Sequence, residues 1–330
     1  MEKYPVKNFA LMMSSLDPVV VCSSDNRYAI PLAVMLRSLA EHLAIGRMAT
    51  VWVLDGGISR RNKRKIIKSL PLRNIEIHWA EVDTTLLADM PVSGHVSLAT
   101  YYRMLLGSTL PKSIEKVIYL DVDIIVLSDI SELWRVPMNG YVVCAVPEPH
   151  RQACDMLDPG IMKGVGLAPS SAYFNAGVMM IDLVKWRRAN LLERACGFVR
   201  LYGNLLRSWD QDILNCLLIK EWGALEEKWN RHVDQLSKMD ERDWDDCRRV
   251  GGCIHFASGI KPWTWWASHP AKGVYFGWVD RTAWKGWRPR PPLRNTIGNR
   301  HWYGKWIRTI PGIGPVWRLT IDWVKRKYDF

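Results

Sequence analysis

Apolar segments alternate with amphipathic ones along the first half of the chain. Four apolar segments are rich in β-branched residues and predict buried strands: 18–24, 49–55, 75–82 and 116–123. Amphipathic segments follow the first three of them and predict helices: 31–44, 60–70 and 97–107. This alternation of strand and helix predicts an α/β fold with a mostly parallel, doubly wound sheet.

The second half has a different pattern. Strand-like segments over 140–146 and 173–181 flank residues 147–172, which are rich in proline and glycine and predict a long binding loop. Two helices and one short strand complete the prediction: 183–202, 210–221 and 251–257. Ligands bind outside the carboxyl ends of the strands in such sheets, so polar residues at those ends are the first candidates for a functional site.

Composition adds limits to this picture. The 330 residues are 48% hydrophobic and 24% charged, which is ordinary for a globular protein with one large domain and additions. No apolar run reaches the ~18 residues that a membrane span needs, and the N-terminus lacks a convincing signal peptide. The seven cysteines have no C-x-x-C spacing and predict reduced thiols in a cytoplasmic protein.

The net charge of +12 is concentrated at the C-terminus. Residues 281–330 contain 12 Lys/Arg and 2 Asp/Glu, whereas the other 280 residues contain 33 Lys/Arg and 31 Asp/Glu. Six tryptophans also lie within 281–330. Five apolar residues fall there on one helical face: Ile313, Trp317, Ile321, Val324 and Tyr328. This pattern predicts a helix on an anionic membrane surface; the alternatives are a helix packed on the domain and nucleic-acid binding.

Paired aspartates are the clearest candidate chemistry. Asp121 and Asp123 end an apolar run, where carboxylates are rarely buried unless they are paired or bind a metal ion. With 21 aspartates, chance alone supplies about one D-x-D pair, and the pair leaves both a metal site and a capped turn open. Asp243 and Asp245 lie in a charged, solvated segment. The absence of a G-x-G-x-x-G and of a Walker lysine motif argues against nicotinamide cofactors and P-loop chemistry.

Five motifs in a fixed order carry a family resemblance. They are SSDNRY (23–28), LDVD (120–123), FNAG (174–177), WDQDILN (209–215) and HFASGIKPW (255–263). Together they resemble glycosyltransferase family 8, retaining enzymes with the Rossmann-like GT-A fold that use nucleotide sugars, and in particular the bacterial lipooligosaccharide and lipopolysaccharide α-galactosyltransferases. The resemblance covers about residues 18–266.

The resemblance implies a metal and nucleotide site. Asp121, Asp123 and His255 match the ligands of a divalent cation, Mn²⁺ or alternatively Mg²⁺, which fits the preference of carboxylate and imidazole groups. Taken without the family, His255 reads as a core histidine. Lys261 matches a contact to the donor diphosphate, and its alternative is an exposed lysine.

Two positions in the nucleotide and phosphate regions depart from the family pattern. Asp25 and Tyr28 match the nucleotide site, where Tyr28 can stack on the uracil, although a plain turn also explains Asp25. Arg27 replaces an asparagine found in relatives. Ser258 stands where relatives carry glycine, with Gly259 next, so the glycine-mediated approach to the phosphate is in question.

The remaining motifs imply contacts to the transferred sugar. Arg103 and Asn175 match residues that contact it, and Gly177 predicts a close backbone approach. Asp210 matches a carboxylate that holds sugar hydroxyls, and Gln211 matches the position that faces the anomeric carbon in the family. An amide is a poor nucleophile, so front-face displacement is favoured, with Asp212 as the alternative nucleophile. Without the family, Arg103 is interpreted as a solvated or salt-bridged helix residue, and the acidic pair as helix-start residues.

The sequence therefore predicts a metal-dependent, retaining hexosyltransferase. It moves galactose or glucose from a UDP-sugar to a saccharide that is expected to be lipid-linked, as in lipopolysaccharide, and forms an α-glycosidic bond. The predicted organisation is an N-terminal extension (1–17), a catalytic domain (18–270) and a basic, Trp-rich extension (271–330) that holds a cytoplasmic protein on the inner face of the membrane. The alternatives are a soluble or protein-linked acceptor and a non-catalytic nucleotide-sugar-binding protein; nucleic acid is not an expected partner.

Overall fold

The computed structural model describes residues 17–71, 73–88, 90–91, 98–233, 241–267 and 271–291, with the backbone alone described at 241–244. The predicted N-terminal extension up to residue 16, and the predicted membrane helix near the C-terminus, lie outside these residues. Among the described residues, no helix combines the length and the apolar character needed to cross a bilayer.

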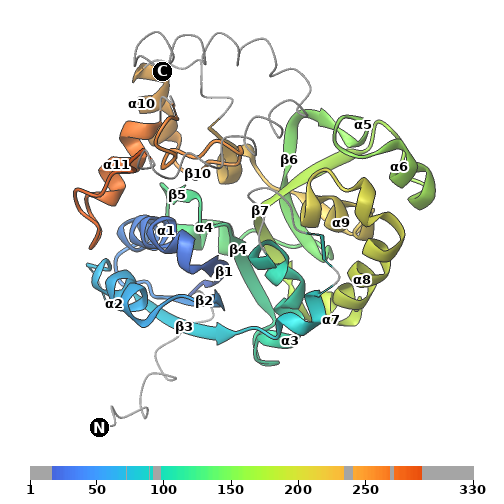
Figure 1. Ribbon diagram of the computed structural model, residues 1–330, viewed down its shortest axis with the longest axis horizontal. Coiled ribbons are helices and arrows are strands. Elements are labelled where there is room, and N and C mark those ends of the chain that lie inside the picture. Colours follow the sequence, from blue (N-terminus) through green and yellow to red (C-terminus); the bar gives the residue numbers. More distant parts are fainter. Residues whose placement is uncertain are drawn as a thin grey trace. The chain divides into compact units, whose positions relative to one another are not determined.

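A seven-stranded sheet forms the centre of the domain (Figure 1). Its order is β3 (Ile75–Glu81), β2 (Ala49–Gly56), β1 (Val19–Asp25), β4 (Lys116–Leu120), β7 (Ala172–Asp182), β6 (Val143–Gln152) and β8 (Trp222–Ala224). The strands from β3 to β4 are parallel, whereas β7 runs antiparallel to both β4 and β6. The predicted mostly parallel sheet is confirmed. Because β7 is reversed, its first half reaches the edge where β1 and β4 end.

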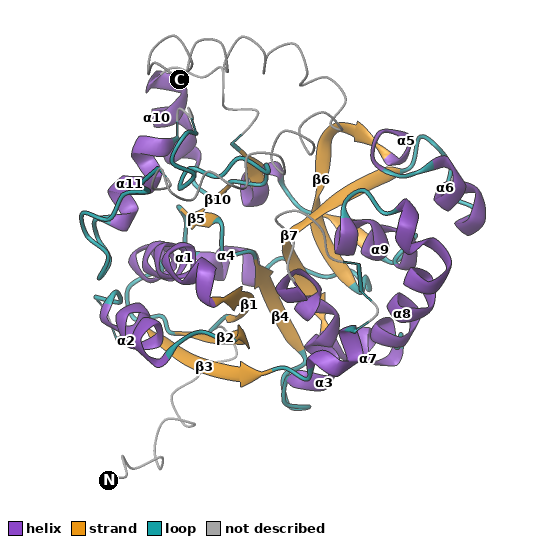
Figure 2. Cartoon of the chain, in the orientation of Figure 1, coloured by secondary structure: helices purple, strands orange, loops and turns teal. Residues whose placement is uncertain are grey.

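Helices cover both faces of this sheet (Figure 2). On one face lie α1 (Ala29–His42), α2 (Arg60–Lys68), α4 (Ile130–Trp134) and α11 (Lys272–Val279). On the other lie α3 (Leu106–Thr109), α7 (Leu183–Arg188), α8 (Leu191–Tyr202) and α9 (Trp209–Leu217). Along β1, Val20 and Cys22 pack with the first group and Val21 with the second. Alternate side chains of a strand point to opposite faces, so a strand covered twice reads as the continuous apolar run seen in the sequence.

A second, three-stranded sheet brings distant segments together. It contains β5 (Ile124–Val126), β10 (Cys253–His255) and β9 (Arg231–His232), with β10 in the middle. β10 pairs antiparallel with β5, and His255 is the partner of Ile124 in this register. The pairing fixes His255 beside the turn that joins β4 to β5. The remaining elements are α5 (Ala153–Met156), α6 (Pro159–Val165), α10 (Glu241–Val250) and the 3₁₀ helices η2 (Asn26–Tyr28), η3 (Thr84–Leu87), η4 (Leu98–Leu105), η5 (Gly203–Leu205) and η6 (Glu227–Asn230).

Four predicted elements differ in the structure. The predicted helix over 183–202 is two helices, α7 and α8, because Asn190 between them has a positive φ of 52°. The predicted loop over 147–172 is wrong, because β6 continues to Gln152 and two short helices, α5 and α6, follow before β7 begins. Buried apolar side chains hold this segment on the domain, and Asp158 caps α6 with Pro159 in its first turn. The predicted helix over 97–107 is a 3₁₀ helix up to Leu105, and the predicted helix over 210–221 ends at Leu217 before β8 begins.

Part of the predicted C-terminal extension belongs to the domain. The chain forms one compact unit up to Arg288, so the predicted boundary at residue 270 falls inside it. α11 packs against α1. Trp284 is buried and Trp287 contacts Phe276 with 6.3 Å between ring centroids. Trp284 is a core residue and the partly buried Trp287 packs against the core, in agreement with the alternative that this part of the extension packs back on the domain.

Candidate active site

A cavity of about 420 Å³ lies at the sheet edge where β1 and β4 end. Twelve of the fourteen predicted site residues line it: Asp25, Tyr28, Arg103, Asp121, Asp123, Asn175, Gly177, Asp210, Gln211, His255, Ser258 and Lys261. Asp212 and Gly259 are not among its lining residues. The motifs come from strands and helices far apart in the sequence, and the fold brings them to one place.

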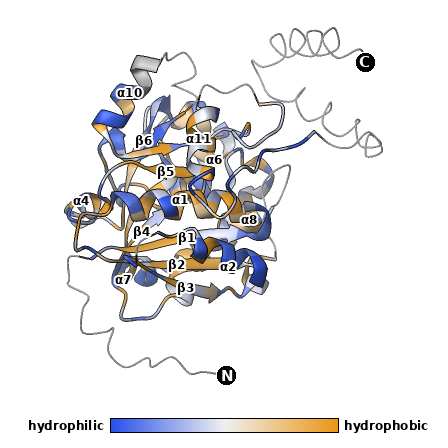
Figure 3. Cartoon of the chain, turned by 90° about the vertical axis from the view of Figure 1, so that its left-hand side faces the viewer, coloured by the Kyte–Doolittle hydropathy of each residue, from blue (hydrophilic) through white to orange (hydrophobic). Residues whose placement is uncertain are grey.

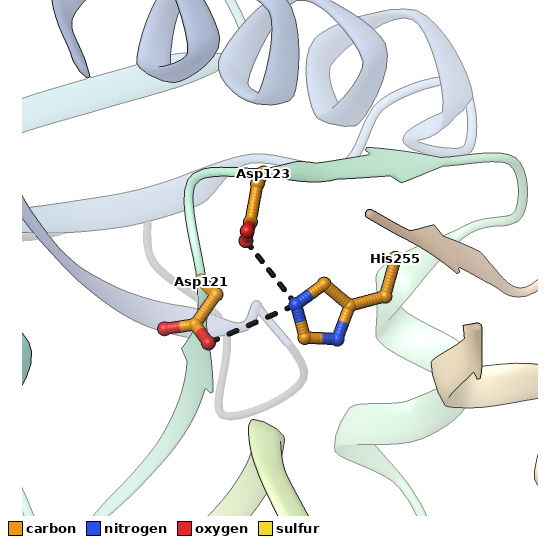
Figure 4. A group of neighbouring side chains, drawn as sticks. All are labelled: Asp121, Asp123 and His255. Atoms are coloured by element: carbon orange, nitrogen blue, oxygen red, sulfur yellow. Dashed lines mark ion pairs between the residues drawn. The ribbon is translucent and has the colours of Figure 1, made fainter. Parts of the chain in front are cut away.

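The turn between β4 and β5 carries the two aspartates. The Asp121 N–H donates to the Gly177 carbonyl at 2.8 Å, and the Phe256 N–H donates to the Asp123 carbonyl at 3.0 Å. These backbone bonds fix the turn between β7 on one side and the chain after β10 on the other. The imidazole Nε2 of His255 lies 3.2 Å from Asp123 Oδ1 and 3.9 Å from Asp121 Oδ2 (Figure 4).

A chain of hydrogen bonds sets the tautomer of His255. The Gly177 N–H is an unambiguous donor and bonds Asn175 Oδ1 at 2.9 Å, which fixes the orientation of that amide. The same oxygen accepts from Nδ2 of Asn230 at 2.8 Å, so Oδ1 of Asn230 faces His255 Nδ1, also at 2.8 Å. His255 therefore carries its proton on Nδ1 when it is neutral, and the lone pair of Nε2 points at the two carboxylates.

This group of atoms fits a divalent cation. Asp121, Asp123 and His255 each offer one ligand atom, and these atoms lie within 4.8 Å of one another. An imidazole lone pair directed at two carboxylates is an unfavourable arrangement by itself and becomes favourable around a cation. The bond from His255 Nδ1 to Asn230 is the outer contact that orients metal-binding histidines. The predicted metal ligands are thus brought together with a suitable donor set.

Lys261 completes the charge balance on this side of the cavity. Its ammonium lies 2.6 Å from Asp123 Oδ2 and donates to the Phe256 carbonyl at 2.6 Å. Burial raises the pKa of a carboxyl group, but here it is opposed chiefly by the Lys261 ammonium, and the pKa of Asp123 lies well below its usual range. Asp123 is therefore ionised at neutral pH.

Arg103 joins the metal side of the cavity to α9. Its Nη2 donates to Asp121 Oδ1 at 2.6 Å, its Nε lies 2.9 Å from Asp210 Oδ2, and its Nη1 donates to the Ala176 carbonyl at 2.6 Å. Burial raises the pKa of Asp210 to about 7 although Arg103 opposes the shift. The guanidinium thus holds the buried Asp210 carboxylate and the half-buried Asp121 carboxylate in place while it lines the cavity.

Asp212 has a structural position. It is fully buried, and its carboxylate accepts three hydrogen bonds: from the Tyr173 hydroxyl at 2.6 Å and from the Arg207 and Ser208 N–H groups at 2.7 Å each. The side chain holds the segment before α9 and points away from the cavity, so the predicted alternative nucleophile is not placed to act as one. Gln211 does line the cavity, where its Oε1 accepts from the Ala176 N–H at 3.1 Å.

At the predicted nucleotide end, the structure confirms the turn-forming role of Asp25, while its contact with a nucleotide stays a prediction. Its Oδ1 accepts from the N–H groups of Arg27 and Tyr28, which makes it the cap of η2, and it also lines the cavity. The exposed Arg27 guanidinium pairs with Asp25 at 3.0 Å and is not among the lining residues. Tyr28 is held edge-on by Trp263, with 5.9 Å between ring centroids.

Sequence reasoning missed four polar residues of this region. Glu148, Arg151 and His232 line the cavity, and Asn230 orients His255 from behind. Glu148 accepts from Asn175 Nδ2 at 2.8 Å and lies 3.6 Å from His232 Nδ1. A carboxylate directly after a predicted strand was a usable signal for Glu148. Asn230 and His232 lie in a four-residue 3₁₀ helix and a two-residue strand, which have no recognisable periodicity.

Replacing Gly177 by alanine tests the position of His255. A Cβ at Gly177 would overlap the imidazole, since it would lie 2.7 Å from Nδ1 and closer still to Cε1. We expect Gly177→Ala to weaken Mn²⁺ binding about 10- to 100-fold, as measured by calorimetry, because displaced ligands bind poorly. Gly197→Ala is the matched control, since nothing lies within 4 Å of its added carbon. Equal Mn²⁺ affinity in both variants would contradict the assignment of His255 as a ligand.

Comparisons with known proteins agree with the geometry. The model of the family described as glycosyl transferase family 8 matches residues 19–267. General stress protein A of Bacillus subtilis is 31% identical over 291 residues, which are 85% of this chain and 96% of that protein. Lipopolysaccharide 1,2-glucosyltransferase of Escherichia coli K12 is 27% identical over 235 residues, 69% of this chain and 67% of that protein. The crystal structure of galactosyltransferase LgtC with donor and acceptor sugar analogs has a TM-score of 0.67 and 25% identity, covering 87% of this chain and 99% of that one. This likeness confirms the predicted GT-A fold.

Proposed function

This chain belongs to glycosyltransferase family 8, and we propose that it is a metal-dependent, retaining hexosyltransferase that uses a UDP-sugar. Membership of the family makes it a sugar transferase; the donor, the metal and the stereochemistry are the proposed parts. The stereochemistry is proposed from the family alone, and one observation supports the donor and the metal. The three candidate metal ligands, the cation of Lys261 and the Asp25–Tyr28 end border the same cavity of about 420 Å³, a size that suits a small-molecule ligand.

The side chains of the cavity divide the work. A divalent cation held by Asp121, Asp123 and His255 would neutralise the charge that develops on the leaving diphosphate. Lys261 supplies a second positive charge close to the same place, and its contact with Asp123 positions it there before a donor binds. Arg103 and Asp210 form an ion pair in the part of the cavity where the transferred sugar is proposed to bind, and the Gln211 side chain lines the same part.

We favour front-face displacement, in which the acceptor attacks from the side that the diphosphate leaves. Two features support it. Gln211 is a poor nucleophile, and Asp212 uses its carboxylate in three structural hydrogen bonds outside the cavity. Glu148 accepts a hydrogen bond from Asn175 and lies near His232. In this mechanism its role is structural, in the wall of the cavity. The new bond then keeps the α configuration of the donor.

We propose a lipid-linked saccharide as the acceptor, reached from the inner face of a membrane. Exposed apolar residues lie in the loop that supplies Ser258 and Lys261 to the cavity: Ile260, Trp265 and Trp266. Tryptophans that combine an apolar ring with a polar edge suit the boundary between water and lipid. A related protein is a lipopolysaccharide glucosyltransferase, which supports the same class of acceptor.

A panel of UDP-sugars tests the proposal. We expect slow release of UDP from one UDP-hexose in the presence of Mn²⁺, and loss of that release in EDTA, because the leaving diphosphate needs the cation. The measurement is UDP formed over time, with UDP-glucose and UDP-galactose as the central members of the panel. If UDP neither binds with Mn²⁺ present nor is released from any donor, the proposed donor and metal are wrong. Binding without release, even with acceptor glycans added, would favour a non-catalytic nucleotide-sugar-binding protein.

A further inference from the structure

The helix α2 carries an unusual concentration of positive charge. Six of its nine residues are basic: Arg60, Arg61, Lys63, Arg64, Lys65 and Lys68. Two of them are engaged with the domain, since Lys63 pairs with Asp55 and Lys65 lies 4.2 Å from the ring centroid of Trp284. Among the described residues, no ion pair involves the other four: Arg60, Arg61, Arg64 and Lys68. All four side chains face solvent.

These four cations share one side of the helix. At 100° per residue, the positions 60, 64, 68 and 61 span about 100°, and Ile67 lies at the edge of the same sector. Ile67 is 53% exposed, whereas the next residue back, Ile66, is fully buried and anchors the opposite side of α2 on the domain. The result is a stripe of four cations with one exposed aliphatic side chain, named here the α2 face. Figure 3 shows α2 in hydrophilic colours on this side of the domain.

Folding does not account for the α2 face. Like charges four residues apart repel, and α2 contains three such pairs: Arg60 with Arg64, Arg61 with Lys65, and Arg64 with Lys68. Two of the cations also stand in the first turn, where the helix dipole disfavours positive charge. Burial and the repulsion from Arg61 lower the pKa of Lys65, in agreement with this crowding. The charges oppose helix formation, so an anionic ligand outside the domain is the better explanation for them.

The α2 face lies beside the segment that leads into the basic tail. The Ala283 N–H donates to Ser69 Oγ at 2.9 Å, and Trp284 lies under Lys65. Lys285 is exposed next to this contact. The chain beyond residue 291 adds eight further Lys/Arg and four tryptophans. The root of the predicted membrane-binding segment and the α2 face are therefore neighbours on one side of the domain.

We propose that the α2 face docks on an anionic lipid bilayer. The four cations meet lipid headgroups while Ile67 enters the interface, an arrangement that suits a membrane surface better than a soluble polyanion, which offers nothing apolar to bind Ile67. This inference rests on the proposed function for its purpose, since a lipid-linked acceptor lies in such a surface. It adds a second attachment site, built into the catalytic domain itself, to the predicted tail.

Vesicle partition of the full-length protein tests the α2 face. The variant R60Q/R61Q/R64Q/K68Q is compared with K163Q/R188Q/R200Q/K220Q, which removes the same four charges from exposed positions elsewhere. On vesicles of phosphatidylglycerol and phosphatidylcholine in equal amounts, we expect the first variant to lose at least about ten-fold in partition coefficient and the second less than about two-fold. Both variants should bind vesicles of phosphatidylcholine alone as weakly as the natural protein.

The variant Ile67→Ser separates a bilayer from a soluble polyanion. We expect it to weaken vesicle partition about two- to four-fold and to leave heparin binding unchanged. Equal partition of the two four-charge variants would overturn the proposal, and so would an Ile67→Ser variant that partitions like the natural protein. UDP-hexose hydrolysis without vesicles should be the same in all variants. If the natural protein neither binds UDP with Mn²⁺ present nor releases UDP from any donor, the proposed function fails while the partition result still decides the α2 face.

Discussion

Replacing Asp123 by asparagine is expected to lower the rate of UDP release from the donor by about 10³-fold or more. Asparagine keeps the shape of the side chain and removes its charge. Asp123 contacts both His255 Nε2 at 3.2 Å and Lys261 Nζ at 2.6 Å, so one substitution removes a ligand of the cation and the anchor of the second positive charge. The measurements are the rate of UDP release at saturating Mn²⁺ and the affinity for Mn²⁺ itself.

Asp245→Asn is the matched control for this experiment. Asp245 belongs to another D-x-D pair, and its exposed carboxylate contacts only Arg248 among the ion pairs of the described residues. Its substitution should change neither the rate of UDP release nor the Mn²⁺ affinity, because surface ion pairs contribute little. A thermal melt of each variant checks that the fold is intact. An Asp123→Asn protein that binds Mn²⁺ as tightly as the natural one would show that this aspartate is not a ligand.

The sequence predicted the sheet and most of the site because these features are local. A strand covered by helices on both faces reads as an uninterrupted apolar run, and its polar ends mark the edge where ligands bind. Asp121 and Asp123 stand out for that reason. The motif around His255 supplied the third ligand, although the register that pairs His255 with Ile124 depends on contacts more than a hundred residues apart.

The two aspartates of α9 show what helix geometry adds. Sequence alone gave Asp210 and Asp212 related roles, yet residues two apart on a helix point in nearly opposite directions. Asp210 accordingly faces Arg103 and the cavity, and Asp212 faces Tyr173 and the segment before α9. This separation could have been predicted from the spacing once the helix was expected to begin near residue 209.

Other parts of the site depend on tertiary contacts that leave no local pattern. Arg103 was expected to contact the sugar, but nothing in its own segment indicates that it holds two carboxylates from separate elements. Asn230 acts only through the orientation it gives to His255, and it precedes a strand of two residues. The segment 147–172 predicts a loop because its prolines and glycines mask the periodicity of its buried apolar residues, and this pattern gives no indication of Glu148 as a site residue.

Replacing Arg103 by methionine is expected to be strongly destabilising as well as inactivating. The substitution leaves Asp121 and Asp210 without their shared cation, and breaking a buried ion pair in this way costs about 3–5 kcal/mol in the free energy of unfolding. For a domain of this size the melting temperature should fall by roughly 5–8 °C. UDP release should fall at least about 100-fold, because the Asp121 carboxylate loses the contact that positions it.

The dependence of this loss on pH identifies its cause. Burial already raises the pKa of Asp210 to about 7, above its value in the unfolded chain, so the folded protein binds the proton more tightly. The free energy of unfolding of the protein therefore decreases as pH rises through the pKa of Asp210. Removing the Arg103 cation raises the pKa of Asp210 further. The deficit of Arg103→Met should accordingly be larger at pH 8 than at pH 6.

A second substitution separates the charge of Arg103 from its packing. Adding Asp210→Asn to Arg103→Met removes one of the unpaired carboxylates, so the double variant should recover part of the lost stability at pH 8 while remaining inactive. Arg200→Met, at an exposed position of α8, serves as control and should change the free energy of unfolding by less than about 0.5 kcal/mol. If the double variant is no more stable than Arg103→Met, the penalty comes from lost packing against Tyr119, whose ring centroid lies 4.4 Å from the guanidinium, and the two ion pairs do not hold the site together.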